Sequence, residues 1–207
     1  VKPLQGAGEC LKLRLDVTQP GQVQAAVAAA YERLGAIDVL VNNAGQGFIT
    51  SVGDAPEAEM RALFELNFFG MVAVTRAFLP RLRAQGHGHI VNISSIAGLI
   101  GRVGSAYYAA TKYAMEGFSE SLAAEVKDFG LRVTIAEPAG FRTGFTAATV
   151  RGEVGSYQQT VGARLDSIAA NLDKVRGDPA GAAKLLVAVG GAPDAPLRLP
   201  LGKGAVE

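Results

Sequence analysis

A tyrosine and a lysine lie four residues apart in this chain, Tyr108 and Lys112, in a stretch that predicts a helix from about residue 106. At about 100° per residue, four steps bring two side chains onto one face of a helix, about one turn apart. A free phenol titrates at about 10 and is a poor acid or base at neutral pH. A neighbouring ammonium favours the phenolate, so we expect Lys112 to lower the pKa of Tyr108 and to allow proton exchange at its hydroxyl.

A serine hydroxyl precedes this tyrosine by thirteen residues. Ser95 follows the run at residues 89–93, whose branched apolar composition is typical of a buried strand, so its hydroxyl is expected at a strand end, where it can hold a substrate oxygen beside Tyr108. Tyr107 would point roughly 140° away from Lys112, which leaves Tyr108 as its partner. The alternative interpretation is an ordinary helical pair with Lys112 in solvent.

An alternation of strands and helices would position these residues. Strands are predicted at residues 11–17, 37–41, 89–93 and 131–136. Helices are predicted from a Thr18 cap to Gly35, from an Asp54 cap to about residue 83, and over about 106–128. This order predicts an α/β fold, a doubly wound parallel sheet with helices on both faces, in one domain spanning residues 1–207.

Polar and small residues gather where these strands end. They comprise Asp16, the NNAG turn at residues 42–45, the serines before residue 96, and the segment 138–143. In open parallel sheets, ligands bind beyond the carboxyl ends of the strands. The sequence therefore predicts a single binding site at this edge of the sheet.

The segment 144–177 has weak periodicity and many small residues, and we expect a substrate lid there, with a helix near residues 161–175. A further helix is predicted from Asp178-Pro179 to about Val189. Residues 197–201 are expected to form an edge strand, because Pro200 is tolerated only at an edge or a bulge.

The composition excludes several classes of protein. Of the 207 residues, 49% are hydrophobic and 19% are charged, with a net charge of +1, which is a globular profile without a basic patch for nucleic acid. The single Cys10 excludes an internal disulfide and favours a reducing, cytoplasmic location. We expect no membrane span, because no apolar run reaches about 18 residues, and no metal site, because no ligand cluster is visible.

The chain resembles the short-chain dehydrogenase/reductase family. The matching motifs, in the order and at the spacings of the family, are Asp16-Val17, NNAG at 42–45, Asn67 within LNFFG, SSIAG at 94–98, YAATK at 108–112 and PAGFRT at 138–143. This resemblance implies a Rossmann-like fold and an oxidoreductase that uses NAD or NADP to interconvert a secondary alcohol and a ketone.

The resemblance also implies catalytic roles. Tyr108 would be the general acid in carbonyl reduction or the base in alcohol oxidation, and Lys112 would lower its pKa and bind the nicotinamide ribose. Ser95 would hold the substrate oxygen, in preference to Ser94. Asn67, which is a poor helix former in mid-helix, would anchor a chain of water molecules to Lys112.

Further residues would bind the cofactor. Asp16, with Val17 beside it, would contact the adenine ring. Asn43, Ala44 and Gly45 would lie along the cofactor. Its nicotinamide end would be fixed by Pro138, Ala139, Gly140, Phe141 and Thr143.

The chain departs from the family pattern in two places. No Gly-rich TGxxxGxG turn precedes Asp16, so we expect the sequence to be a fragment that lacks residues at both ends, including about the first two strands. Ala139 replaces the glycine of the family's Pro-Gly, a mild change unless that position needs a positive φ.

Some questions stay open from the sequence. Substrate choice would depend on the lid and on Gly98, Val103 and Phe145, and the residues that would separate NAD from NADP are absent. The resemblance implies a homodimer or homotetramer with a small-molecule alcohol or ketone as substrate, and neither nucleic acid nor membrane as partner. A non-catalytic dinucleotide-binding or regulatory protein is the alternative from another class, and an isomerase or dehydratase on the same scaffold is a third.

Overall fold

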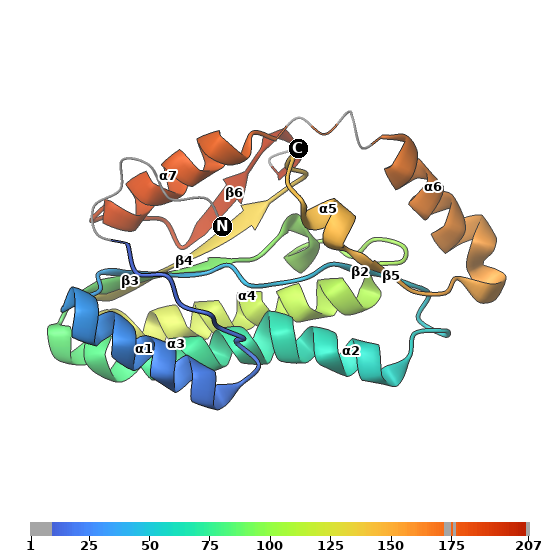
Figure 1. The fold of residues 1–207 in the computed structure, drawn as a ribbon. Helices are drawn as coiled ribbons and strands as arrows, with labels where there is room; N and C mark the ends of the chain where they lie inside the picture. The colour runs from blue at the N-terminus through green and yellow to red at the C-terminus, as the bar shows by residue number, and fades with distance from the viewer. Residues whose placement is uncertain (1–9, 172–174, 176, 206–207) are drawn as a thin grey trace.

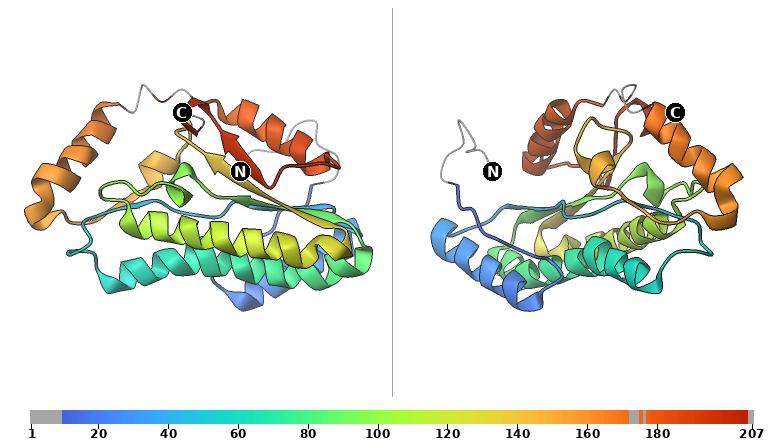
Figure 2. Two further views of the ribbon diagram at one scale, coloured as in Figure 1. Left: turned by 180° about the vertical axis from the view of Figure 1, so that it is seen from behind. Right: turned by 45° about the vertical axis from the view of Figure 1, so that its right-hand side comes forward.

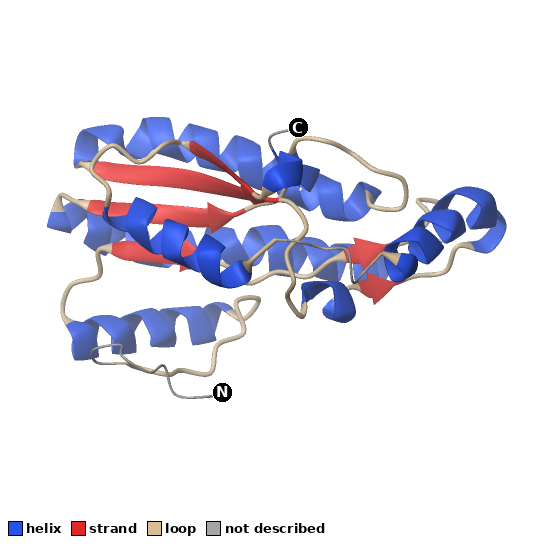
Figure 3. Cartoon of the chain, turned by 90° about the horizontal axis from the view of Figure 1, so that it is seen from above, coloured by secondary structure: helices blue, strands red, loops and turns tan. Residues whose placement is uncertain are grey.

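A computed structural model describes residues 10–171, 175 and 177–205 of the chain. Four parallel strands form the central sheet in the order β1-β3-β4-β6. They are β1 (Val39–Asn42), β3 (Gly88–Ile93), β4 (Leu131–Pro138) and β6 (Arg198–Leu201). Helices α1 to α4 lie under this sheet and α7 lies over it (Figure 1), while Figure 3 shows the strands side by side from above. The predicted α/β fold, with a parallel sheet covered on both faces, is confirmed.

The two central strands are almost wholly buried, as expected for parallel strands covered on both faces. Buried polar groups on the sheet must therefore find partners within the protein. Asn42 on β1 donates to Asn92 on β3 (2.8 Å), and Asn92 donates to Ser119 (2.8 Å) on α4, which spans Ala106–Val126. A polar chain thus ties two strands to the helix that carries Tyr108 and Lys112.

The helix predicted after Asp54 begins later than expected, at Glu57, and runs to Gln85. It consists of α2 (Glu57–Phe64), a π-helical turn (Glu65–Phe69) and α3 (Gly70–Gln85). The Asp54 cap is a wrong prediction, because its carboxylate accepts the Ser51 hydroxyl (2.6 Å) in the preceding turn. Contrary to expectation, this helix has the length and composition of a membrane span. It supplies Val74, Phe78 and Leu82 to the core, and 39% of its most apolar window is buried.

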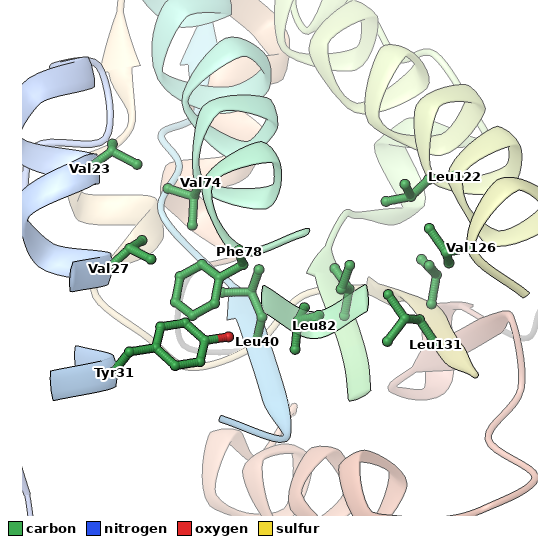
Figure 4. Close-up of a cluster of buried hydrophobic side chains, with 12 residues drawn as sticks. Val23, Val27, Tyr31, Leu40, Val74, Phe78, Leu82, Leu122, Val126 and Leu131 are labelled. Carbon is green, nitrogen blue, oxygen red and sulfur yellow. The ribbon is translucent and has the colours of Figure 1, made fainter. Parts of the chain in front are cut away.

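The main hydrophobic core lies between the sheet and the helices below it (Figure 4). Helix α1 (Pro20–Leu34) contributes Val23, Val27 and Tyr31, and the Tyr31 ring packs on Phe78 of α3 at 5.7 Å between centroids. Helices α3 and α4 and the strands contribute the rest. This packing fixes α3 and α4 against the sheet that leads to the carboxyl ends of β3 and β4.

Residues 11–17 are not a strand, which corrects a prediction. An alternating pattern forms a strand only where a neighbour supplies the hydrogen-bond ladder, and none of the described strands pairs with this segment. Leu13 and Leu15 stay exposed, and the Asp16 N–H donates to the Gln22 side chain (2.9 Å) of α1. The Thr18 cap is also wrong: the helix begins at Pro20 with Gln19 at its N-cap, and Thr18 donates to Asp16 instead.

Past β4 the chain forms short elements away from the main sheet (Figure 2). They are α5 (Phe145–Ala148), β5 (Val150–Arg151), a π turn (Gln158–Gly162) and α6 (Ala163–Ala170). Strand β5 pairs with β2 (Phe48–Ile49) in a second, two-stranded sheet. Of the helix predicted at 161–175, residues 172–174 lie outside the described residues.

The last two predicted elements agree with the structure. Helix α7 spans Pro179–Gly191, and Asp178 caps it by accepting the N–H groups of Ala180 and Gly181 (both 3.0 Å). Strand β6 lies at one edge of the sheet, where Pro200 costs no ladder bond on the open side.

Candidate active site

Tyr108 and Lys112 lie on one face of α4, with the Lys112 Nζ 5.9 Å from the centroid of the Tyr108 ring. Lys112 is only 5% exposed, so the alternative of a solvated lysine is wrong. Its Nζ donates to the Ile93 carbonyl (2.8 Å) at the end of β3. Tyr107 points elsewhere, because its hydroxyl donates to the Val52 carbonyl (2.9 Å).

Ser95 approaches Tyr108 from the end of β3. It is the N-cap of the short turn Ile96–Gly98, and its Oγ accepts the Ala97 N–H (3.1 Å). The Ser95 hydroxyl also reaches the Pro138 carbonyl (3.5 Å) at the end of β4 and interacts with the Tyr108 hydroxyl. The serine, the phenol and the start of the 138–143 segment therefore meet at one point.

The protonation of this pair differs from the expectation. Burial raises the pKa of Tyr108, and its hydrogen bond with Ser95 offsets this only in part. The predicted lowering by Lys112 does not outweigh this burial, and the ammonium donates to the Ile93 carbonyl and lies 5.9 Å from the centroid of the Tyr108 ring. Burial lowers the pKa of Lys112 to about 8, against an opposing Coulombic effect of Glu116. Tyr108 thus keeps its proton at neutral pH, and Lys112 is mostly charged.

Asn67 sits in the π-helical turn and is fully buried. Its side chain accepts the Gln46 N–H (2.8 Å) and donates to the Gln46 carbonyl (2.9 Å) and to Thr111 Oγ1 (3.1 Å). A π turn re-aims side chains in mid-helix and recurs at functional sites. Here it directs Asn67 at the loop after β1 and at the helix of Tyr108.

Gly45 lies between Asn67 and Lys112. A Cβ there would be 3.3 Å from Asn67 Oδ1 and 3.8 Å from Lys112 Nζ, so a side chain would fill the gap. Asn43, Ala44 and Gly45 are exposed at the carboxyl end of β1, whereas Asn42 is buried in the polar chain. The described contacts use one of the three N–H groups of Lys112, which leaves two for a polar ligand such as a ribose. This open, donor-rich edge fits a nicotinamide dinucleotide.

The 138–143 segment forms the rim on the other side. The Ala139 N–H donates to the Leu201 carbonyl (2.9 Å), and Phe141 pairs with Gly177. Ala139 needs no positive φ, since no described residue other than glycine has one, so the alanine causes no backbone strain. Gly140 and Thr143 are exposed on this rim, beyond the partly buried Pro138.

Asp16 and Val17 are not joined to this cluster by any described contact. Hydrogen bonds from Thr18 lower the pKa of Asp16, and Val17 packs against Gly70 at the start of α3. The expectation that Gly98 lines a substrate pocket is also unmet. A Cβ at Gly98 would lie 2.9 Å from Glu116 and from Ser94 Oγ, so this glycine closes over a polar cluster.

Sequence reasoning missed four residues of the site: Gln46, Thr111, Glu116 and Arg198. Glu116 alone carried a local signal, since it lies four residues after Lys112. Among the described residues, no group of metal-ligating side chains is placed to hold an ion.

Comparisons with known proteins agree with this arrangement. A family profile described as "short chain dehydrogenase" matches residues 2–153. The chain is 39% identical over 204 residues to "Oxidoreductase BOA17" of Botryotinia fuckeliana, covering 98% of this chain and 74% of that protein. It is 41% identical over 145 residues to "3-ketodihydrosphingosine reductase" of Bacteroides thetaiotaomicron, covering 70% of this chain and 54% of that protein.

Solved structures show the same likeness. A short-chain dehydrogenase from Streptomyces avermitilis superposes with a TM-score of 0.84 at 41% identity, covering 94% of this chain and 72% of that one. A gluconate 5-dehydrogenase from Burkholderia cenocepacia in complex with NADP and tartrate has a TM-score of 0.62 at 34% identity, covering 65% and 52%. A relative from Burkholderia phymatum in complex with NAD has a TM-score of 0.63 at 32% identity, covering 66% and 50%.

Proposed function

Because the chain belongs to the short-chain dehydrogenase/reductase family of NAD(P)-dependent oxidoreductases, we propose that it interconverts a secondary alcohol and a ketone, with Tyr108 as the general acid or base. The observation that carries this proposal is the meeting of three groups: the Tyr108 hydroxyl, the Ser95 hydroxyl and the buried ammonium of Lys112. A protein that only binds a dinucleotide has no need of all three. The nicotinamide cofactor, NAD or NADP, supplies or accepts the hydride when bound.

In carbonyl reduction, the substrate oxygen would lie between the hydroxyls of Ser95 and Tyr108. Ser95 orients that oxygen, and Tyr108 donates its proton as negative charge develops there. Tyr108 is protonated at neutral pH and can donate, while burial alone makes the phenol a weaker acid, so the charge of Lys112 would have to offset that effect in the reaction. Lys112 then stabilises the phenolate that remains, and Asn67 holds the β1 loop against α4.

The cofactor contacts are part of the same proposal. Lys112 and Tyr108 would face the nicotinamide ribose, with Asn43, Ala44 and Gly45 along the cofactor and Asp16 and Val17 toward the adenine. Pro138, Ala139, Gly140, Phe141 and Thr143 would hold the carboxamide end. The exposure of residues beyond β1 and β4 supports these assignments, since they lie at the edge where ligands of such sheets bind.

The lid, the assembly and the location complete the proposal. Residues 144–177 would cover the substrate, and the Phe145 ring already packs 5.9 Å from the Tyr108 ring. We expect a homodimer or homotetramer acting on a small molecule in the cytoplasm. Sedimentation velocity of the purified protein would check the assembly.

Tyr108→Phe tests the catalytic proposal. With a panel of secondary alcohols and ketones, followed by the absorbance of reduced nicotinamide, turnover should fall by about 10²–10⁴-fold. Cofactor affinity, measured by calorimetry, should barely change because the ring stays in place. Tyr107→Phe is the matched control, and it should retain activity since its hydroxyl bonds to Val52. Equal turnover in Tyr108→Phe and wild type would reject the mechanism, and cofactor binding without any turnover in wild type would favour the non-catalytic alternative.

A further inference from the structure

Glu116 is a buried carboxyl group for which the mechanism above has no use. It stands one turn after Lys112 on the same face of α4 and is 4% exposed. Its Oε2 accepts a hydrogen bond from Arg198 (2.6 Å) on β6. Its Oε1 is buried without a hydrogen bond of standard geometry, and it lies beneath Gly98, beside the equally buried Ser94 Oγ. An ionisable group held so close to a catalytic pair calls for an explanation.

Arg198 gathers three carboxylates around one guanidinium. Its Nη1 donates to Glu116 and to Glu137 of β4, and its Nη2 donates to Glu120 of α4, each at 2.6 Å. Glu137 is 1% exposed, whereas the Glu120 side chain is half exposed. One guanidinium cannot balance three carboxylates when all of them are ionised, so a further cation beside this partly buried cluster would be favoured.

Lys112 is a buried cation that interacts electrostatically with Glu116. On α4 it has Glu116 on one side and Tyr108 on the other, and its only described hydrogen bond is to the neutral Ile93 carbonyl. Burial alone favours loss of its proton, and the Coulombic attraction of Glu116 opposes that loss. Burial and Glu137 in turn raise the pKa of Glu116, while Ser94 and Arg198 lower it.

We propose that Glu116 is a positioning residue that keeps Lys112 protonated in its buried site, and through Lys112 maintains the reactivity of Tyr108. Arg198 holds the carboxylate in place and limits its charge, and Gly98 lets the strand-end turn close over it. The coupling between Glu116 and Lys112 is argued from their burial one turn apart on one face of α4, whereas the effect on Tyr108 rests on the proposed oxidoreductase function.

Glu116→Gln and Glu120→Gln form a matched pair for the test. Each removes one carboxylate from Arg198 and leaves an amide oxygen to accept from it, but Glu116 lies one helical turn from Lys112 whereas Glu120 lies two turns away. In the reductive direction, which needs both the phenol and the ammonium protonated, kcat/KM should fall at alkaline pH. Glu116→Gln should move that alkaline limb to lower pH by about one unit. Glu120→Gln should leave it within about 0.2 units of wild type, and Glu116→Asp, which keeps the charge, should recover most of the shift.

A second readout does not depend on activity. The Lys112 side chain can be followed by NMR in protein labelled at lysine, its signal assigned by absence from Lys112→Met. In wild type, Lys112 should be mostly protonated at pH 7, and in Glu116→Gln it should lose its proton at lower pH. A wild-type Lys112 that is neutral at pH 7 would overturn the proposal even if Glu116→Gln failed to fold.

The outcomes separate this inference from the proposed function. Equal pH profiles and equal Lys112 titrations in the two glutamine variants would show that Glu116 only anchors Arg198, and would leave the oxidoreductase standing. A shifted Lys112 titration in a protein that turns over no alcohol or ketone would support the charge coupling and reject the proposed function.

Discussion

Thr111 connects the two halves of the site through a single hydroxyl. It is fully buried, donates to the Tyr108 carbonyl (2.7 Å) and accepts from Asn67 Nδ2 (3.1 Å). Thr111→Val keeps the branched shape of the side chain but removes the oxygen that accepts a hydrogen bond from Asn67 Nδ2. We expect a loss of about 1–3 kcal/mol in the free energy of unfolding, measured by urea denaturation, and a fall of about tenfold in kcat/KM.

The matched control is Thr111→Ser, which retains the hydroxyl and should stay close to wild type in activity. If Thr111→Val matched wild type in both measurements, the hydroxyl would contribute nothing to holding Asn67. The role of Asn67 would then rest on Gln46 alone.

Local spacing predicted the residues that share one helix or one strand end. The four-residue step placed Lys112 beside Tyr108, and the strand end placed Ser95 near both. The raised pKa of Tyr108 was not predictable, because it depends on burial, which no local spacing in the sequence shows. Arg198 reaches Glu116 across 82 residues, and no sequence period spans such a distance.

At the scale of elements, two glycine turns end the helices that precede β3 and β4. Gly86 and Gly130 have φ of 76° and 72°, in the left-handed region that disfavours other residues. The two turns touch: a Cβ on Gly130 would lie 2.2 Å from the Gly86 carbonyl oxygen, whereas a Cβ on Gly86 meets nothing within 4 Å. An alanine at Gly86 would therefore test the cost of the left-handed backbone alone, whereas an alanine at Gly130 would add the cost of steric overlap.

Gly86→Ala should cost about 1–2 kcal/mol in the free energy of unfolding, from the left-handed backbone alone. Gly130→Ala should cost at least about twice that, because the methyl group forces two backbone turns apart. Urea denaturation of both variants at neutral pH measures the difference. Equal losses in the free energy of unfolding would mean that the two turns can move apart without a measurable cost. The contact between them would then not fix the register of β3 on β4.

Most helices and strands were predicted within a few residues, and the failure at residues 11–17 has a physical reason. Apolar periodicity and caps are local, so α4 and the Asp178-capped α7 were found within a few residues. A strand depends on a neighbour, and the alternating residues 11–17 have none among the described strands. The π turn at Asn67 left no pattern beyond a polar residue inside an apolar helix.

At the scale of the whole molecule, His89 joins two strands of the sheet to α7, which lies over it. It lies on β3 with no exposed surface, and its ring nitrogens contact Thr134 Oγ1 of β4 (2.9 Å) and the Gly190 carbonyl of α7 (3.2 Å). Burial lowers the pKa of His89 despite backbone hydrogen bonds that oppose the shift. The folded protein therefore takes up this proton at lower pH than the unfolded chain does.

The sign of the effect on stability follows from that difference. The contribution of neutral His89 is complete above the unfolded pKa of about 6.5 and is lost as pH falls from there toward the folded pKa, at up to about 1.4 kcal/mol per pH unit. We expect the free energy of unfolding to depend on pH between about 6.5 and 5 less steeply in His89→Gln than in wild type. His87→Gln is the control, because the His87 side chain is 62% exposed, and it should keep the wild-type slope. If His89→Gln kept the wild-type slope as well, acid sensitivity would arise elsewhere, and the link between β3 and α7 would not depend on a neutral imidazole.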